Sequence, residues 1–175
     1  MKSNSDSTSR NADGQSRASV ALLPEPAQLF QAIAGLYTST SPLVQWAREL
    51  SDLHAGLIPF EFDIAPQHRV IAFTQYRTEI ERVVGEVNLW AVGHVPRTKS
   101  ARKHTHSLGE VISHIAKIYA EVWWTVLHSA DAETRHQAWV HLSEAREGYA
   151  EMVNEIRAKQ LQLPTGWQGV RRETA

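Results

Sequence analysis

Residues 70–91 read VIAFTQYRTEIERVVGEVNLWA, and this segment is the one around which the fold is organised. Its apolar side chains recur at spacings of three, four and seven, which is typical of the buried face of a long helix. They are Val70, Phe73, Ile80, Val84, Val87 and Ala91. Arg77 falls in the same series, so we expect its guanidinium to face neighbouring helices. Because an unpaired buried charge is strongly destabilising, carboxylates or the anionic group of a ligand should lie opposite it.

Composition sets limits on the class of protein. The 175 residues suffice for one domain with a sizeable core, and the net charge of -1 gives no global reason to expect nucleic acid or a membrane as partner. The absence of cysteine excludes disulfides, a thiolate nucleophile and cysteine-based zinc or iron–sulfur sites. No apolar run is long enough to span a membrane, and no signal-peptide pattern is present. We therefore expect a cytoplasmic protein.

The two ends of the chain differ in composition from its middle. Residues 1–20 are rich in Ser, Asn, Asp and Arg and predict a disordered tail, and residues 166–175 predict a flexible one. A single helical domain is expected over residues 21–165. It begins with a short helix in which Pro26 occupies the first turn. The apolar face of that helix comprises Leu29, Phe30, Ile33 and Leu36.

A second helix starts at Ser41-Pro42 and carries unexpected polar residues. Its apolar face comprises Leu43, Trp46, Leu50, Leu53 and Leu57. His54 and Glu61 lie seven residues apart beside that face, with Asp63 just beyond, so two helical turns place them on one side. Gly56 and Pro59 predict a kink between them, which often accompanies a site. The alternative is that Pro59 ends the helix and Glu61 is solvated.

The loop over residues 93–106 is strongly basic. It holds no acidic residue, and its charged and titratable side chains are Arg97, Lys99, Arg102, Lys103, His94, His104 and His106. These could bind a phosphate or carboxylate, but the loop lacks the Gly-rich phosphate cradle, so a solvated connection between antiparallel helices is the favoured interpretation. It holds no aromatic base-stacking platform, which argues against a nucleic-acid interface.

Two further helices complete the pattern. Ser107 and Glu110 form a capping box, after which Leu108, Val111, Ile115, Ile118, Val122 and Val126 make an apolar face. Glu110, His114, Lys117 and Glu121 fall on another face, spaced for ion pairs in solvent. The last helix spans about residues 131–161. The sequence therefore predicts an all-α, antiparallel four-helix bundle with a short extra N-terminal helix.

A metal site is one hypothesis for such a bundle, because bundles hold metals with inward His and Glu. Glu133 and His136 have the Glu-x-x-His spacing of di-iron helices, but the motif appears once and in an exposed first turn, so we interpret it as a surface feature. A mononuclear site from His54, Glu61 and one loop histidine is the alternative. No cofactor is expected.

Acid–base chemistry without a cofactor is the other hypothesis, since the chain has no nucleotide-binding, Ser-His-Asp or zinc-protease motif. We expect Glu61 to be the general acid–base group, assisted by His54, with Asp63 as a further acid. The predicted substrate-binding residues are Arg77, Tyr76, Trp46, Tyr119, His106, Arg97 and Lys99, which suit an aromatic or anionic ligand. The structural alternative is a buried ion pair that only joins the second and third long helices.

From Pro42 to Leu163 the chain resembles DUF4254, a helical family of unassigned function. The residues that carry the resemblance are Leu53-His54 with Glu61, Arg77-Thr78, and Thr105 to Gly109. Where the family pattern has aspartate directly after the glutamate, this chain has Phe62. The chain is also similar, without a defining motif, to small cofactor-free enzymes that condense an aryl-ethylamine with an aldehyde in the Pictet–Spengler manner. The first resemblance implies a helical fold but no particular reaction, and the second implies a condensation or cyclisation.

These features favour a cofactor-free small-molecule enzyme of specialised metabolism. A non-catalytic ligand-binding or interaction module is the alternative, and a His/Glu metal-binding bundle is another. A homodimer is also predicted, because tryptophan-rich bundles often bury a second face against a copy of themselves. The four tryptophans concerned could equally line a pocket: Trp90, Trp123, Trp124 and Trp139.

Overall fold

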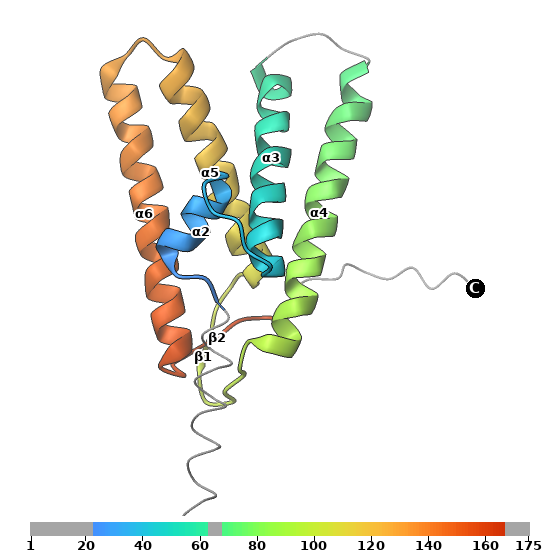
Figure 1. Ribbon diagram of the computed structural model, residues 1–175, viewed down its shortest axis with the longest axis vertical. Coiled ribbons are helices and arrows are strands. Elements are labelled where there is room, and N and C mark those ends of the chain that lie inside the picture. Colours follow the sequence, from blue (N-terminus) through green and yellow to red (C-terminus); the bar gives the residue numbers. More distant parts are fainter. Residues whose placement is uncertain (1–22, 63–67, 167–175) are drawn as a thin grey trace, which may run out of the picture.

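A computed structural model describes residues 23–62 and 68–166 and confirms the all-α prediction. Its helices are α2 (Pro26–Ile33), α3 (Pro42–Phe62), α4 (His68–His94), α5 (Leu108–His128) and α6 (Ala132–Arg157), and its strands are β1 (Arg102–Lys103) and β2 (Leu161–Gln162). Two antiparallel hairpins, α3–α4 and α5–α6, stand side by side, close together near the strands and apart at their far ends (Figure 1). The tails predicted for residues 1–20 and 166–175 lie outside the described residues, except for Gly166.

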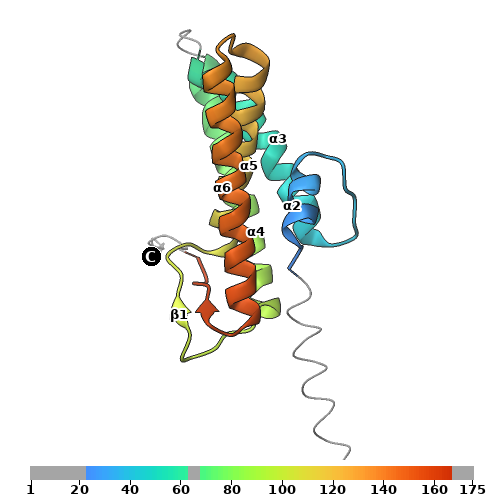
Figure 2. The same ribbon diagram turned by 90° about the vertical axis from the view of Figure 1, so that its left-hand side faces the viewer.

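The core lies where the hairpins are close together. Helix α3 packs on α4 and α5, and α5 packs on α6, while α2 lies across α3 and α6. The α2 helix and the strand pair cover opposite faces of the long helices (Figure 2). Leu50, Val83, Ile112 and Ile156 are fully or almost fully buried in this core. None of the helices in the described ranges is long and apolar enough to cross a membrane.

The capping box predicted at the start of α5 is confirmed, and it lies where α5 comes close to α4. The Ser107 amide donates to Glu110 Oε2 at 2.7 Å, and the Glu110 amide donates to Ser107 Oγ at 3.4 Å. Gly109, which lies between these two residues, is close to the backbone of Val84 in α4. A Cβ at this position would collide with the Val84 carbonyl oxygen. The Gly109 amide donates to Asn88 Oδ1 at 2.9 Å, which fixes α4 to α5 at this point.

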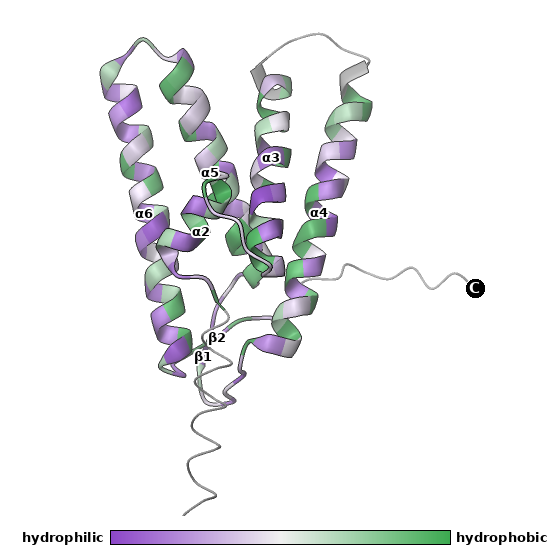
Figure 3. Ribbon diagram, viewed as in Figure 1, coloured by the Kyte–Doolittle hydropathy of each residue, from purple (hydrophilic) through white to green (hydrophobic). Residues whose placement is uncertain are grey.

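The prediction of a continuous buried face along α4 is wrong for its first half. Val83 and Val87 are fully buried, but Val70 and Ile71 are each 64% exposed, and Arg77 is exposed. The reason is that α4 diverges from α5 toward its N-terminus, so its early turns have a neighbour on one side only (Figure 1). In the view of Figure 3, apolar and polar residues alternate along this helix. Leu36, predicted on the apolar face of the first helix, lies beyond the end of α2 and is 82% exposed.

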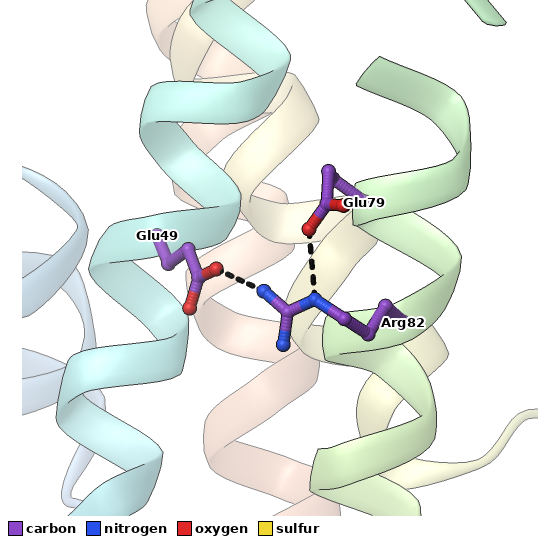
Figure 4. A network of polar contacts seen from close by, with 3 residues as sticks. All are labelled: Glu49, Glu79 and Arg82. Atoms are coloured by element: carbon purple, nitrogen blue, oxygen red, sulfur yellow. Dashed lines mark hydrogen bonds and ion pairs between the residues drawn. The ribbon is translucent and has the colours of Figure 1, made fainter. Parts of the chain in front are cut away.

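Arg82, five residues after Arg77, provides an ion pair that joins α3 to α4. Its Nε donates to Glu79 Oε2 at 2.7 Å, and its Nη2 pairs with Glu49 Oε1 of α3 (Figure 4). The hydrogen bond to Glu79 and the charge of Glu49 raise the pKa of Arg82. This network lies in solvent rather than in the core, so it does not carry the penalty that a buried charge would.

Helix α3 continues through Pro59 to Phe62, so Pro59 does not end it. The backbone of Glu61 therefore belongs to the same helix as His54, as the first of the two sequence-based alternatives requires. The Glu61 side chain and Asp63 lie outside the described residues.

Candidate functional site

His54 is half-buried and is held by a hydrogen bond that joins α3 to α5. Its Nε2 lies 3.0 Å from the Oγ of Ser113, a buried residue of α5. Burial lowers the pKa of His54 to about 4, and the positive charges of Lys117 and His114 contribute in the same direction. The imidazole is therefore neutral at pH 7, able to donate one hydrogen bond and accept another.

A pocket of about 380 Å³ opens beside His54. It lies between the second half of α3, the first half of α4 and the outer turns of α5. We call it the central pocket. Its apolar wall consists of Leu57, Ile58, Phe73 and Ile80, and its polar lining consists of His54, Arg77, Glu81, Lys117 and Glu121. It combines an apolar body with a few charged groups, as is usual for small-molecule sites.

The two cations of the central pocket differ in their partners. Lys117 Nζ lies 3.5 Å from Glu121 Oε1, one turn along α5, so part of its charge is balanced within the protein. The Arg77 guanidinium lies over the Phe73 ring, 5.9 Å from the ring centroid. In the part of the chain that the structure describes, no carboxylate pairs with Arg77. Arg77 is therefore available to an anionic ligand, although as an exposed side chain and not as the buried charge that the sequence predicted.

A larger groove of about 660 Å³ lies on the other side of His54 and Lys117, between α5, α6 and the loop after β1. Four further histidines line this histidine groove: His104, His106, His114 and His141. His104 Nδ1 lies 2.9 Å from the His106 carbonyl oxygen, which orders the loop. His141 lies 3.6 Å from Glu144, which also lines the groove. The structure thus brings predicted His106 onto the same groove as His54, but not into the central pocket.

The other predicted binding residues are dispersed. Tyr76 packs across Gly56 and lies 5.8 Å from the Phe60 ring, so it fills the α3–α4 contact. Trp46 packs against the main core, and Tyr119 lines a separate pocket on the α2 face. Arg97 and exposed Lys99 lie in the loop before β1, with Arg97 near the chain segment that follows β2. The basic loop therefore does not bring its Arg97 and Lys99 to Arg77.

Metal ligation finds no support among residues 23–60 and 70–166, because their side chains include no group of three or more His, Asp or Glu that could hold an ion. Glu133 and His136 are exposed at the start of α6, as expected for a surface feature, and Glu133 accepts a hydrogen bond from Gln137. The alternative with Glu61 as a ligand depends on a side chain outside the described residues.

Besides the apolar wall, four polar residues of the site were not predicted from sequence: Ser113, Glu81, Lys117 and Glu121. Ser113 could have been found, since it is a polar residue on the apolar face of its helix between Ile112 and Ile115. Lys117 and Glu121 do form the predicted ion pair, but the divergence of α4 turns their face of α5 into the wall of a pocket.

Comparison with models of protein families, with curated proteins and with solved structures gives no match to this chain. The resemblances to DUF4254 and to Pictet–Spengler-type enzymes therefore stay predictions, and the function is inferred from the geometry of the site alone.

Proposed function

We propose that this protein binds a small organic anion with an apolar body in the central pocket. The observation that carries the proposal is Arg77, an arginine with no carboxylate partner in the described chain, at the edge of an apolar pocket. Guanidinium binds carboxylate and phosphate groups through two parallel hydrogen bonds, which gives orientation as well as charge. Lys117 adds a second positive charge on the opposite wall.

The apolar wall determines what the rest of the ligand should be. Leu57 and Ile58 are largely buried, and Phe73 and Ile80 are half-buried, so a hydrocarbon or aromatic body would displace water from side chains that are partly desolvated already. A volume of about 380 Å³ lies toward the small end of the range for ligand sites. A metabolite-sized aromatic or aliphatic acid fits this description better than a nucleotide or a polymer.

Binding of an anion would also change the chemistry of His54. Its pKa is low because the imidazole is buried and because Lys117 and His114 repel a further positive charge. A negative group in the central pocket would offset that repulsion and raise the pKa of His54 toward neutrality. The substrate would then help to create the base that acts on it.

This coupling favours a second candidate, which is cofactor-free acid–base catalysis on the bound anion. His54 would accept the proton, and Ser113 would hold the ring in position. A condensation or cyclisation of the Pictet–Spengler type belongs to this candidate, since such a reaction needs proton transfer and no cofactor. The assignment of Glu61 as the acid–base group stays a prediction within it.

The test of the binding proposal is a titration of phenylacetate, phenylpyruvate and phenyl phosphate into the wild-type protein and Arg77→Met. We expect at least one of these anions to bind, and Arg77→Met to weaken it about tenfold or more, which corresponds to about 1.4 kcal/mol. Because Arg77 is exposed, its replacement should leave the melting temperature unchanged. Arg146→Met on α6, also exposed, is the matched control and should bind like the wild type. Equal affinities for all three proteins would contradict the proposal.

Catalysis is tested separately with His54→Gln, which retains a hydrogen-bonding group beside Ser113. Once a turnover assay exists, this variant should lose about 10²-fold or more in kcat while keeping most of its affinity for the anion. His136→Gln, at an exposed position of α6, is the control. Full turnover in His54→Gln would leave binding as the supported function and return attention to Glu61.

A further inference from the structure

A further pocket, separate from the central pocket and the histidine groove, is lined in part by the end of α2. Helix α2 lies on the face of the bundle opposite the strand pair (Figure 2). The pocket has a volume of about 360 Å³ and is formed by the end of α2, the middle of α3 and the outer half of α5. We call it the tryptophan pocket. Its lining includes Arg48, Asp52, Tyr119, Trp123, Trp124 and Leu127. Only Ile58 is shared with the residues of the central pocket given above.

One wall of the tryptophan pocket is aromatic. Tyr119 and Trp123 are one turn apart on α5, with ring centroids 6.3 Å from each other, and Trp124 follows on the next position. The Trp123 ring is supported from behind by Trp139 of α6, at 6.2 Å and edge to face. Even so, Trp123 remains 47% exposed and Leu127 70% exposed. Clustered aromatic side chains that stay open to solvent and are held by neighbours are typical of binding surfaces.

The facing wall is polar, and its arginine is already committed. Arg48 Nη2 lies 2.7 Å from Asp52 Oδ1, and its Nη1 donates to the Ile33 carbonyl oxygen at 3.1 Å. The guanidinium also lies directly against Gly35, where it leaves no space for a side chain. Gly35 has a φ of 74°, which favours glycine. Arg48 therefore serves to close the end of α2 and to hold Asp52 in place.

Asp52 is the charged group that remains available to a ligand. Its Oδ1 pairs with Arg48, and no interaction of its other oxygen is found in the described part of the chain. A carboxylate oxygen only accepts hydrogen bonds, and indole faces attract positive charge. Both walls consequently favour the same ligand chemistry, whereas an anion would meet the Asp52 carboxylate.

We propose that the tryptophan pocket is a second binding site, which takes a flat aromatic molecule bearing a cationic amine. The ring lies against Trp123 and Tyr119, and the ammonium donates to the free oxygen of Asp52. This site prefers the opposite charge to the central pocket and does not depend on the function proposed for that pocket.

The experiment uses 2-naphthylmethylamine, with 2-naphthylmethanol and 2-naphthoate as its neutral and anionic counterparts. Binding is followed by the indole N–H resonances of the six tryptophans in a ¹H–¹⁵N spectrum, assigned by single Trp→Phe substitutions. We expect the amine to shift the Trp123 and Trp124 resonances and to bind at least tenfold more tightly than the alcohol, with no binding of the naphthoate at this pocket. Arg77→Met should leave this binding unchanged.

Asp52→Asn tests the role of the carboxylate, and Glu147→Gln, an exposed acid of α6, controls for the loss of one negative charge. We expect Asp52→Asn to bind the amine no better than the alcohol, and Glu147→Gln to behave as wild type. Trp123→Leu, which retains an apolar residue at a half-exposed position, should weaken all naphthyl binding several-fold. Equal affinities for amine and alcohol in the wild type, or an unchanged affinity in Asp52→Asn, would overturn the proposal. It would also be overturned if these resonances moved with protein concentration in the absence of ligand, because self-association through Trp123 would then account for the exposed surface.

Discussion

From the low pKa of His54 we predict how much the free energy of unfolding should fall as the pH is lowered. The unfolded chain binds a proton at His54 below its ordinary pKa of 6.5, whereas the folded protein does so only below about 4. The unfolded state is therefore favoured as the pH falls from 6.5 to 4, and no such loss occurs above 6.5. The two pKa values differ by 2.5, and each pKa unit corresponds to about 1.36 kcal/mol. The total loss in the free energy of unfolding is therefore about 3 kcal/mol.

The same values give the loss at an intermediate pH. At pH 5 the unfolded chain is almost fully protonated at His54 and the folded protein is about one-tenth protonated, so about 2 kcal/mol should be lost. The assay is urea unfolding of the wild type and His54→Gln at pH 7.5, 6.5, 5.5 and 5. The other histidines are common to both proteins, so the change in the difference between their unfolding free energies reports on position 54.

Between pH 7.5 and pH 5 the wild type should therefore lose about 2 kcal/mol more than His54→Gln does. His136→Gln should follow the wild type, because His136 is exposed at the surface of α6. A constant difference between wild type and His54→Gln across this range would show that the imidazole titrates normally. His54 would then not be the partly buried, neutral group inferred at the edge of the central pocket.

Two further predictions concern the closed end of the bundle. Gly109→Ala should destabilise the fold by about 2–4 kcal/mol, since the new Cβ would collide with the Val84 backbone. A Cβ at Gly148 meets open space, so Gly148→Ala should stabilise α6 by up to about 1 kcal/mol. The same shift in melting temperature for both variants would refute this prediction. Tyr149→Phe removes the hydroxyl that donates to the Pro24 carbonyl oxygen at 3.0 Å and should cost about 1–2 kcal/mol in urea unfolding, and an unchanged midpoint would mean that this buried bond contributes nothing.

Much of the site depends on features that no local pattern records. His54 was recognised from its place beside an apolar face, and Arg77 from its place in a helical series. The prediction that Arg77 is buried was wrong, however, because it required α4 to be buried along its whole length. The divergence of the two hairpins exposes Arg77 and converts Lys117, an ordinary solvated residue by spacing, into part of a pocket wall. The sharing of one pocket by His54, Arg77 and Lys117 follows from the angle between helices.

The sequence by itself determined the helices and where they begin. Ser107 and Glu110 accept hydrogen bonds from free amides at the start of α5, and Asp131 does the same for α6. Apolar residues at a period of 3.6 favour helix over strand. Because these interactions join residues only a few positions apart, they can be recognised in the sequence. The tertiary structure alone decided how the helices splay, that Arg82 rather than Arg77 joins α3 to α4, and that Ser113 meets His54. Such contacts join residues up to 59 positions apart, and they depend on the packing of whole helix faces, which a one-dimensional pattern does not contain.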